Sequence, residues 1–139
     1  DRAALDVALA VGLKAGGWVP KGRRAEDGPI DGYYPVRETA GTDYAGRTLK
    51  NVEDSDATLI LTRGEPEGGT KLALDHARAT AKPFLIVDLG RSRSPLAALK
   101  WLEAKRPKVL NVAGPRESEA GGIYDEATAF LKNLFTLAG

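Results

Sequence analysis

The sequence predicts an α/β domain of the Rossmann-like class, a doubly wound parallel sheet with helices on both faces. Short apolar runs alternate along the chain with helical segments of about ten residues, which is the pattern of right-handed βαβ units. The runs are continuously apolar, as in strands buried on both faces. The chain has 139 residues. That length fits one domain, so we assign residues 1–139 to a single Rossmann-like domain.

The first third of the chain predicts a helix, a short strand and a long loop. Leucines recur every four residues from Leu5 to Leu13, so we expect a helix over residues 3–14. Two glycines end it, and residues 17–19 predict a very short strand. Residues 20–41 are rich in proline and glycine. A loop of this length inside a compact domain is usually functional or disordered.

The rest of the chain alternates strands and helices. The expected strands are 57–62, 84–87 and 108–112, and the expected helices are 42–53, 70–80, 95–105 and 123–137. Thr42 suits the cap of the first of these helices, because its hydroxyl can accept a hydrogen bond from a free backbone N–H. Pro95 suits the first turn of a helix, where no N–H is needed.

Composition excludes several classes of function. Lys plus Arg is 20 and Asp plus Glu is 19, so the net charge is +1 and gives no electrostatic case for a nucleic-acid or membrane-surface partner. No apolar run approaches the length that spans a bilayer. Cysteine is absent, which excludes disulfides, thiolate catalysis and sulfur-bound zinc. With His76 as the single histidine, a Ser-His-Asp triad or a multi-histidine metal site is not expected.

Glycines and a threonine follow the strand expected at 57–62. In open parallel sheets, ligands bind at the carboxyl ends of the strands. Gly64, Gly68 and Gly69 lie in the segment after this strand, and Thr70 opens the next helix. The free N–H groups and the dipole of a helix N-terminus favour an anion, so the segment predicts a phosphate or oxyanion cradle. A plain turn with a threonine cap is the alternative.

A second anion-binding segment is predicted after the strand expected at 108–112. Gly114 follows the strand end, and Arg116 and Ser118 come soon after it. Arginine is the planar donor that suits phosphate or molybdate-type oxyanions. An ordinary charged surface loop is the alternative.

Polar residues recur on one face of the helix expected at 42–53. Arg47, Asn51 and Asp54 follow one another at i, i+4 and i+7, and Ser55 extends a neighbouring polar row. These residues are candidates for contacts with a ligand. A polar face turned to solvent is the alternative.

The long loop carries a cationic cluster. Lys21, Arg23 and Arg24 lie close together in the sequence, next to Glu26 and Asp27. The three cations are candidates for a lid over an anion. The alternative is a set of ion pairs with the two acidic neighbours.

Five segments together resemble one known family. They are residues 16–28, 34–38, 47–56, 68–70 and 111–118. They are similar to the family named putative molybdenum carrier, and the resemblance covers essentially the whole chain. That family is part of a Rossmann-like superfamily that includes the molybdenum-cofactor carrier of algae and the cytokinin-activating phosphoribohydrolases. The resemblance also implies a strand and a Gly-Gly-Gln-Thr-Gly run upstream of Asp1.

The resemblance implies a protein that binds a phosphorylated or oxyanionic small molecule at the strand ends. The candidates are molybdenum cofactor, molybdate and a nucleotide. Backbone N–H groups at residues 68–70 would hold the anion, with charge from Arg47 and Arg116. Asn51 and Asp54 would recognise the polar organic part of the ligand. We expect a cytoplasmic protein without a nucleic-acid or membrane partner. We also expect a homo-oligomer, because apolar helices such as 123–137 could pack against a second copy and because the family analogy implies it.

Two alternatives to a carrier remain open. One is an enzyme similar to the nucleotide phosphoribohydrolases, and the other is a nucleotide-sensing module. The phosphoribohydrolase motif has a glutamate three residues after its threonine, whereas this chain has Ala73 at that position. The missing carboxylate favours binding without turnover.

Overall fold

The computed structural model describes residues 44–115 and 120–138, together with four two-residue strands that precede them. These strands are β1 (Trp18–Val19), β2 (Arg24–Ala25), β3 (Gly28–Pro29) and β4 (Arg37–Glu38). β1 pairs in parallel with β4, and β2 pairs in antiparallel with β3. The short strand expected at 17–19 is therefore confirmed. The helix expected at 3–14 lies outside the described residues.

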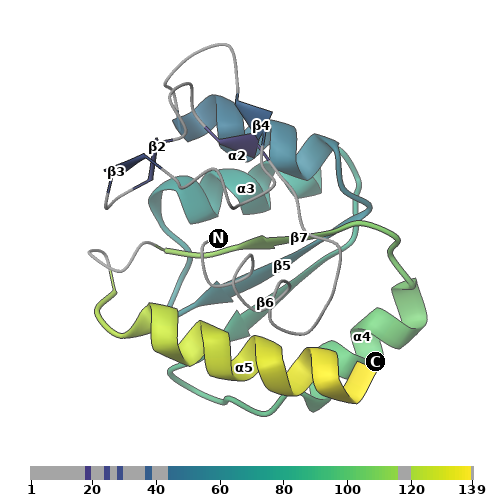
Figure 1. Cartoon of the computed structure of the whole chain (residues 1–139). Helices are drawn as coiled ribbons and strands as arrows, with labels where there is room; N and C mark the ends of the chain where they lie inside the picture. Colours follow the sequence, from purple (N-terminus) through teal and green to yellow (C-terminus); the bar gives the residue numbers. More distant parts are fainter. Residues whose placement is uncertain are drawn as a thin grey trace.

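The body of the domain is a three-stranded parallel sheet between two pairs of helices (Figure 1). The strands are β5 (Ala57–Thr62), β6 (Phe84–Asp88) and β7 (Leu110–Ala113), in the order β6-β5-β7. α2 (Tyr44–Glu53) and α3 (Gly68–Ala79) cover one face. α4 (Leu96–Lys105) and α5 (Ile123–Ala138) cover the other. The predicted Rossmann-like α/β class with helices on both faces is confirmed.

The order of the strands creates a switch point beside β5. The chain passes from β5 through α3 to β6 on one side, and then through α4 to β7 on the opposite side of β5. Loops that leave the carboxyl ends of β5 and β7 therefore diverge to opposite faces of the sheet. In open α/β sheets this divergence opens the crevice in which ligands bind.

The face covered by α4 and α5 holds the larger apolar core. Leu59 and Leu61 point to this face from β5, and they pack with Phe130, Leu131 and Leu134 of α5. All five side chains are at most 2% exposed. Burial of large aliphatic and aromatic groups is the main favourable contribution to folding, so this face supplies most of the hydrophobic stabilisation.

The face covered by α2 and α3 is built from smaller and more polar side chains. Thr58, Ile60 and Thr62 point to it from β5 and are buried. Val52, Ala73 and Ala77 form its apolar cluster. Small side chains let helices and sheet approach closely, but they leave the carboxyl end of this layer incompletely filled.

The boundaries of α3 differ from the prediction. The helix begins at Gly68, two residues before the expected start, because the carbonyl of Glu67 accepts its first hydrogen bonds. Gly68 has a positive φ of +54°, which glycine adopts readily. Thr70 is therefore not the cap. Its N–H donates to the carbonyl of Glu67 at 3.1 Å, and the N–H of Lys71 donates to the same oxygen at 3.2 Å.

The boundaries of β7 and the burial of β6 also differ from the prediction. β7 begins at Leu110, because the N–H groups of Lys108 and Val109 donate to Oδ2 of Asp56 at 3.0 and 2.9 Å instead of joining the sheet ladder. β6 was expected to be buried on both faces, yet Ile86 is 39% exposed. β6 lies at the margin of the described sheet, where α3 covers it only in part.

The amino ends of the strands are tied to α2 by a lysine. The Nζ of Lys82 donates to the carbonyls of Val52, Glu53 and Ser55 at 3.2, 2.5 and 2.7 Å. These carbonyls belong to the C-terminal end of α2, where a helix leaves acceptors unpaired and favours a cation.

Within the described residues, no helix has the length and apolar character needed to cross a membrane.

Candidate functional site

A cavity of about 230 Å³ opens at the carboxyl ends of β5 and β7, on the face covered by α2 and α3. Its walls are the first two turns of α2, the first two turns of α3 and the end of β7. These are the elements that meet at the switch point, so the topology of the sheet accounts for the position of the cavity.

The N-terminus of α3 forms one end of the cavity. Gly68 and Gly69 are the first residues of the helix, and both line the cavity. In the described part of the chain their N–H groups have no hydrogen-bond acceptor, whereas those of Thr70 and Lys71 are satisfied by Glu67. No atom lies within 4 Å of the position that a Cβ of Gly69 would occupy. An anion can therefore approach the two free amides and the positive end of the helix dipole.

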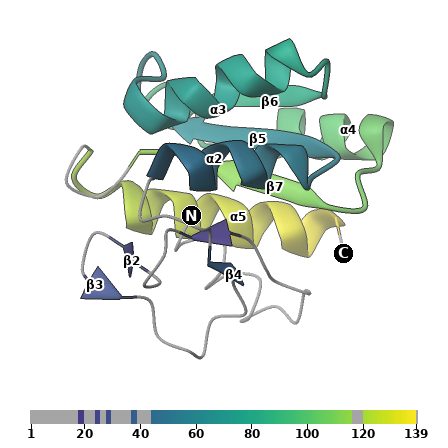
Figure 2. The ribbon, with the colours of Figure 1, turned by 90° about the horizontal axis from the view of Figure 1, so that it is seen from above.

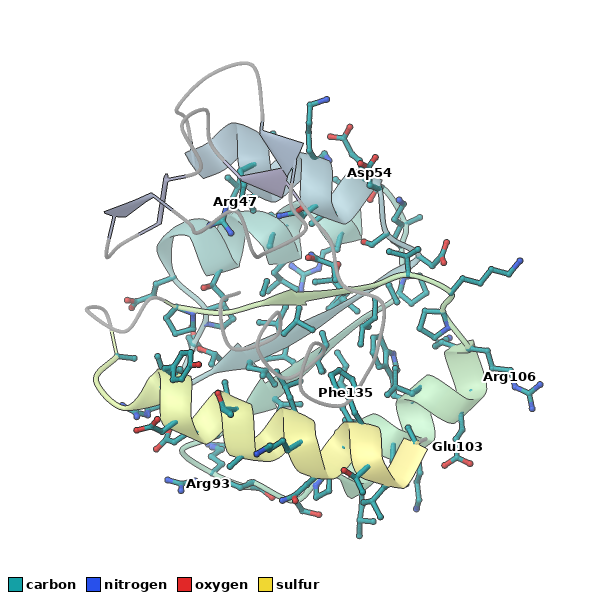
Figure 3. The ribbon with its side chains drawn as sticks, in the orientation of Figure 1. Arg47, Asp54, Arg93, Glu103, Arg106 and Phe135 are labelled. Atoms are coloured by element: carbon teal, nitrogen blue, oxygen red, sulfur yellow. The ribbon has the colours of Figure 1, made fainter. Side chains whose placement is uncertain are left out.

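Arg47 adds a positive charge to this end of the site. Its side chain extends from α2 toward the beginning of α3, as Figure 3 shows, and it lines the cavity. The residue is partly buried. A guanidinium offers several N–H donors in one plane, which suits the oxygens of phosphate or of a tetrahedral oxyanion.

Two amide side chains lie in the wall of the same cavity. Asn51 follows Arg47 by one helical turn, so both face the cavity from α2. Asn111 lines it from β7, and its Nδ2 donates to Oγ1 of Thr58 at 3.3 Å. That bond orients the amide and leaves its oxygen available to accept a hydrogen bond. Asn51 and Asn111 thus supply neutral donors and acceptors to the wall of the cavity.

Gly114 closes the cavity at the end of β7. A Cβ at this position would lie 2.6 Å from the carbonyl oxygen of Leu61, a distance that real side chains do not adopt. The chain leaving β7 must therefore be glycine here in order to stay close to β5. This contact fixes the position of the wall that carries Asn111.

The structure brings together six of the residues predicted from the sequence. They are Arg47, Asn51, Gly68, Gly69, Thr70 and Gly114. Thr70 lines the cavity, but its N–H is not available to a ligand because it already donates to the carbonyl of Glu67. Gly64 does not line the cavity. It has a φ of +75° and shapes the exposed turn after β5.

Asp54 and Ser55 lie at the opposite end of α2 and do not line the cavity. Asp54 follows Arg47 by seven residues, which is about 10 Å along a helix, and Figure 3 shows the two side chains at opposite ends of α2. The Oγ of Ser55 donates to the carbonyl of Val52 at 2.9 Å. Both residues shared a helix face with the site in the sequence pattern, but the axial distance separates them from it.

Asn111 is a site residue that the sequence analysis did not select. The signal was present, since Asn111 is the one polar side chain within the strand Leu110–Ala113. A polar residue in a half-buried strand usually has a hydrogen-bond partner, and here Thr58 supplies it. Of the other candidates, Lys21, Arg23, Arg116 and Ser118 lie outside the described residues, and Arg24 lies in β2. Their roles remain predictions.

A pair of arginines near the same strand ends is used for packing on the other face. Arg63 Nε donates to Oε1 of Glu126 at 2.7 Å, and Arg93 Nη2 donates to Oε2 of the same carboxylate at 2.8 Å. Glu126 lies in the first turn of α5 and is largely buried. The network ties the segments after β5 and β6 to α5. These charges are therefore engaged away from the cavity.

The described lining of the cavity offers groups that bind rather than groups that transfer protons. Its side chains are a guanidinium, two carboxamides, two hydroxyls and apolar groups. Ala73 lines the cavity at the position where the phosphoribohydrolase motif has its glutamate. Among the residues that the structure describes, there is also no group of three or more His, Cys, Asp or Glu side chains that could hold a metal ion.

The sequence profile of the circularly permutated YpsA SLOG family matches residues 1–135. The chain belongs to this family. A solved structure, that of a putative molybdenum carrier protein from Syntrophus aciditrophicus SB, is 41% identical in sequence and superposes with a TM-score of 0.91. The match covers 96% of this chain and 87% of that chain. The resemblance to the family named putative molybdenum carrier is therefore confirmed. No curated protein matches the chain.

Proposed function

We propose that this protein binds a small phosphorylated or oxyanionic molecule in the cavity between α2, α3 and β7, and holds it without chemical conversion. One observation carries the proposal. The free amides of Gly68 and Gly69 and the guanidinium of Arg47 converge on one cavity at the switch point of the sheet.

The size and lining of the cavity favour an anion with a compact polar group attached. A volume of about 230 Å³ is below the range of about 300–1,000 Å³ that is usual for drug-sized ligands. It accommodates an oxyanion or a phosphate readily, and a larger ligand would extend out of the opening. Asn51 and Asn111 would bind hydroxyl or N–H groups next to the anion.

Molybdate, molybdenum cofactor and a nucleotide each fit the donor set. Molybdate is a tetrahedral oxyanion that hydrogen-bond donors can hold. Molybdenum cofactor and a nucleotide would place a phosphate at the start of α3 and a nitrogen heterocycle near the amides. The chain has no cysteine, so no thiolate of its own can ligate molybdenum. Molybdenum would therefore be cargo that is held through its oxygens or its organic ligand.

An enzyme similar to the phosphoribohydrolases is a weaker candidate. Hydrolysis of a glycosidic bond requires a carboxylate or a comparable group near the reacting atoms. Ala73 supplies none, and the other described lining residues carry no acid or base. Release of a base from a nucleoside monophosphate would be the direct sign of that activity.

Substitution of Gly69 by aspartate tests the proposal. Gly69→Asp places a carboxylate at the first turn of α3. The position of the added Cβ is open, and the helix dipole favours a negative charge there. We expect the protein to stay folded and to lose its ligand, because the new charge repels an anion. Native mass spectrometry of the full-length protein, purified from a cofactor-replete host, measures the bound mass and identifies the released molecule.

Gly121→Asp is the matched control. Gly121 also has open space at its Cβ position, but it lies in the turn before α5 and does not line the cavity. We expect this variant to retain the ligand. Equal retention by both variants, or a purified protein that is empty and shows no thermal shift with molybdate or adenosine monophosphate, would contradict the proposal.

A further inference from the structure

The outer edge of β6 is a second feature of the fold that the binding cavity does not explain. β6 pairs with β5 on one side only, and no other described strand lies beyond it (Figure 2). All five residues of β6 pair in continuous register with β5, so no bulge twists the edge away. Proteins usually prevent another strand from pairing with such an edge by placing lysine, proline or a bulge in it. The strand Phe-Leu-Ile-Val-Asp contains neither lysine nor proline.

Two backbone hydrogen bonds to β5 fix which backbone groups of β6 face outward. The carbonyl of Pro83 accepts from the N–H of Thr58, and the N–H of Leu89 donates to the carbonyl of Thr62, so both residues face β5. Backbone groups alternate in direction along a strand. Phe84, Ile86 and Asp88 therefore turn their N–H and C=O groups away from β5. The carbonyl of Asp88 is engaged by the N–H groups of Arg91 and Ser92.

We propose that two copies of this chain associate through antiparallel pairing of their β6 edges, with Ile86 opposite the partner's Ile86. A two-fold axis through the Ile86 pair places the donors of each β6 edge opposite the acceptors of the other. Each Ile86 exchanges two hydrogen bonds with the partner's Ile86, and each Asp88 N–H donates to the carbonyl of the partner's Phe84. Four backbone hydrogen bonds form, and the two sheets become one continuous sheet.

Side-chain placement supports the same arrangement. Phe84, Ile86 and Asp88 share the face of the sheet that α3 covers, because Phe84 packs against the cluster of α2 and α3. A two-fold axis perpendicular to the sheet keeps that face common to both copies. Pairing would then bury Ile86, which is 39% exposed in the single chain.

The charges at the two ends of β6 are complementary in this arrangement. At the amino end, the guanidinium of Arg78 lies 5.4 Å from the centre of the Phe84 ring. At the carboxyl end, Oδ1 of Asp88 accepts a hydrogen bond from the N–H of Gly90 at 2.9 Å, and Oδ2 lies 4.0 Å from Nε of Arg91. Antiparallel pairing brings Arg78 near the partner's Asp88 at both ends of the junction. A second copy of this chain is therefore the occupant that the edge fits.

Cross-linking through one new cysteine tests the arrangement. The chain has no cysteine, so Ile86→Cys introduces the only thiol. Opposite residues of a hydrogen-bonded antiparallel pair have Cα atoms about 5.5 Å apart, within the range of about 4.4–6.8 Å that disulfides bridge. We expect a covalent dimer on oxidation or with a short bis-maleimide. The control Val109→Cys, at an exposed position before β7, should give no covalent dimer under the same conditions.

Sedimentation equilibrium of the full-length protein gives the second readout. We expect the unmodified protein to dimerise, and Ile86→Lys to raise the dissociation constant at least tenfold while circular dichroism stays unchanged. Val109→Lys should leave the constant unchanged. A monomeric protein, a dimer that Ile86→Lys does not weaken, or equal cross-linking of both cysteine variants would each overturn the proposal. None of these outcomes depends on ligand binding, so the proposed function stands or falls separately.

Discussion

The two faces of the sheet are built from different kinds of side chain. The face under α4 and α5 packs Leu59 and Leu61 against Phe130 and the leucines of α5, with almost no exposed area. The face under α2 and α3 buries threonines against alanines, and it opens at its carboxyl end into the cavity. One strand, β5, serves both faces by alternation of its side chains.

This difference separates the residues that stabilise the domain from those that line the candidate binding cavity. Large apolar groups fill one layer completely, which stabilises the sheet as a platform. Small and polar groups in the other layer bring Arg47, Gly68 and Asn111 around a space that a larger core would fill. Substitutions on the two faces should therefore have different consequences, and the following variants test that expectation.

Phe130→Ala should have the largest effect on stability. Phe130 is 2% exposed and lies in the centre of the core under α5. Truncation leaves a cavity, so we expect the free energy of unfolding to fall by about 3–5 kcal/mol. Urea denaturation followed by circular dichroism measures it. A loss below about 1 kcal/mol would contradict the assignment of most stabilisation to this face.

Gly114→Ala should affect both stability and binding. The added Cβ would lie 2.6 Å from the carbonyl oxygen of Leu61, so the chain after β7 must move. We expect a loss of about 1–3 kcal/mol in unfolding free energy, as for other overpacked positions. The displaced wall should also weaken ligand binding in calorimetric titration. Gly121→Ala, which meets no atom within 4 Å, is the control and should change neither quantity.

Lys82→Met should have a smaller effect, confined to stability. The variant keeps the length of the side chain and removes the ammonium that binds three carbonyls at the end of α2. We expect a loss of about 1 kcal/mol in unfolding free energy with unchanged ligand binding, since Lys82 lies at the other end of the sheet from the cavity. Thermal denaturation with ligand titration distinguishes the two effects.

Lys71→Met is the comparison for that variant. Lys71 makes one exposed i,i+4 pair with Asp75 at 3.1 Å. Such pairs contribute about 0.3–0.5 kcal/mol at most. An effect of Lys82→Met no larger than that of Lys71→Met would show that the three carbonyl contacts do not stabilise α2.

The fold could be predicted from the sequence because its main signals are local. The apolar run Ala57–Thr62 and the helix at 123–137 are found within one residue of the expected positions. The starts of α3 and β7 could not be predicted from local pattern. The start of α3 is set by the hydrogen bonds to the carbonyl of Glu67. The start of β7 is set by the carboxylate of Asp56, which is more than fifty residues away from the N–H groups it binds.

The candidate site was predictable in part, for a similar reason. Residues next to strand ends, such as Gly68, Gly69 and Gly114, follow from the general position of ligands in parallel sheets. Asp54 and Ser55 illustrate the limit of helical periodicity, which gives the face of a helix but not the position along its axis. Asn111 stood out in the sequence as a polar residue within an apolar strand, but its partner Thr58 could be found only from the structure, because Thr58 belongs to a strand distant in sequence.

The most direct test of the central claim is a titration followed by ¹H–¹⁵N correlation spectra of the full-length protein. Molybdate and adenosine monophosphate are added separately as probes. The account predicts that the backbone amides of Gly68 and Gly69 and the side-chain amide of Asn111 shift most, while the amides of Ala127 and Phe130 in α5 stay in place. Absence of shifts with both probes, or larger shifts in α4 and α5 than at the start of α3, would contradict the account.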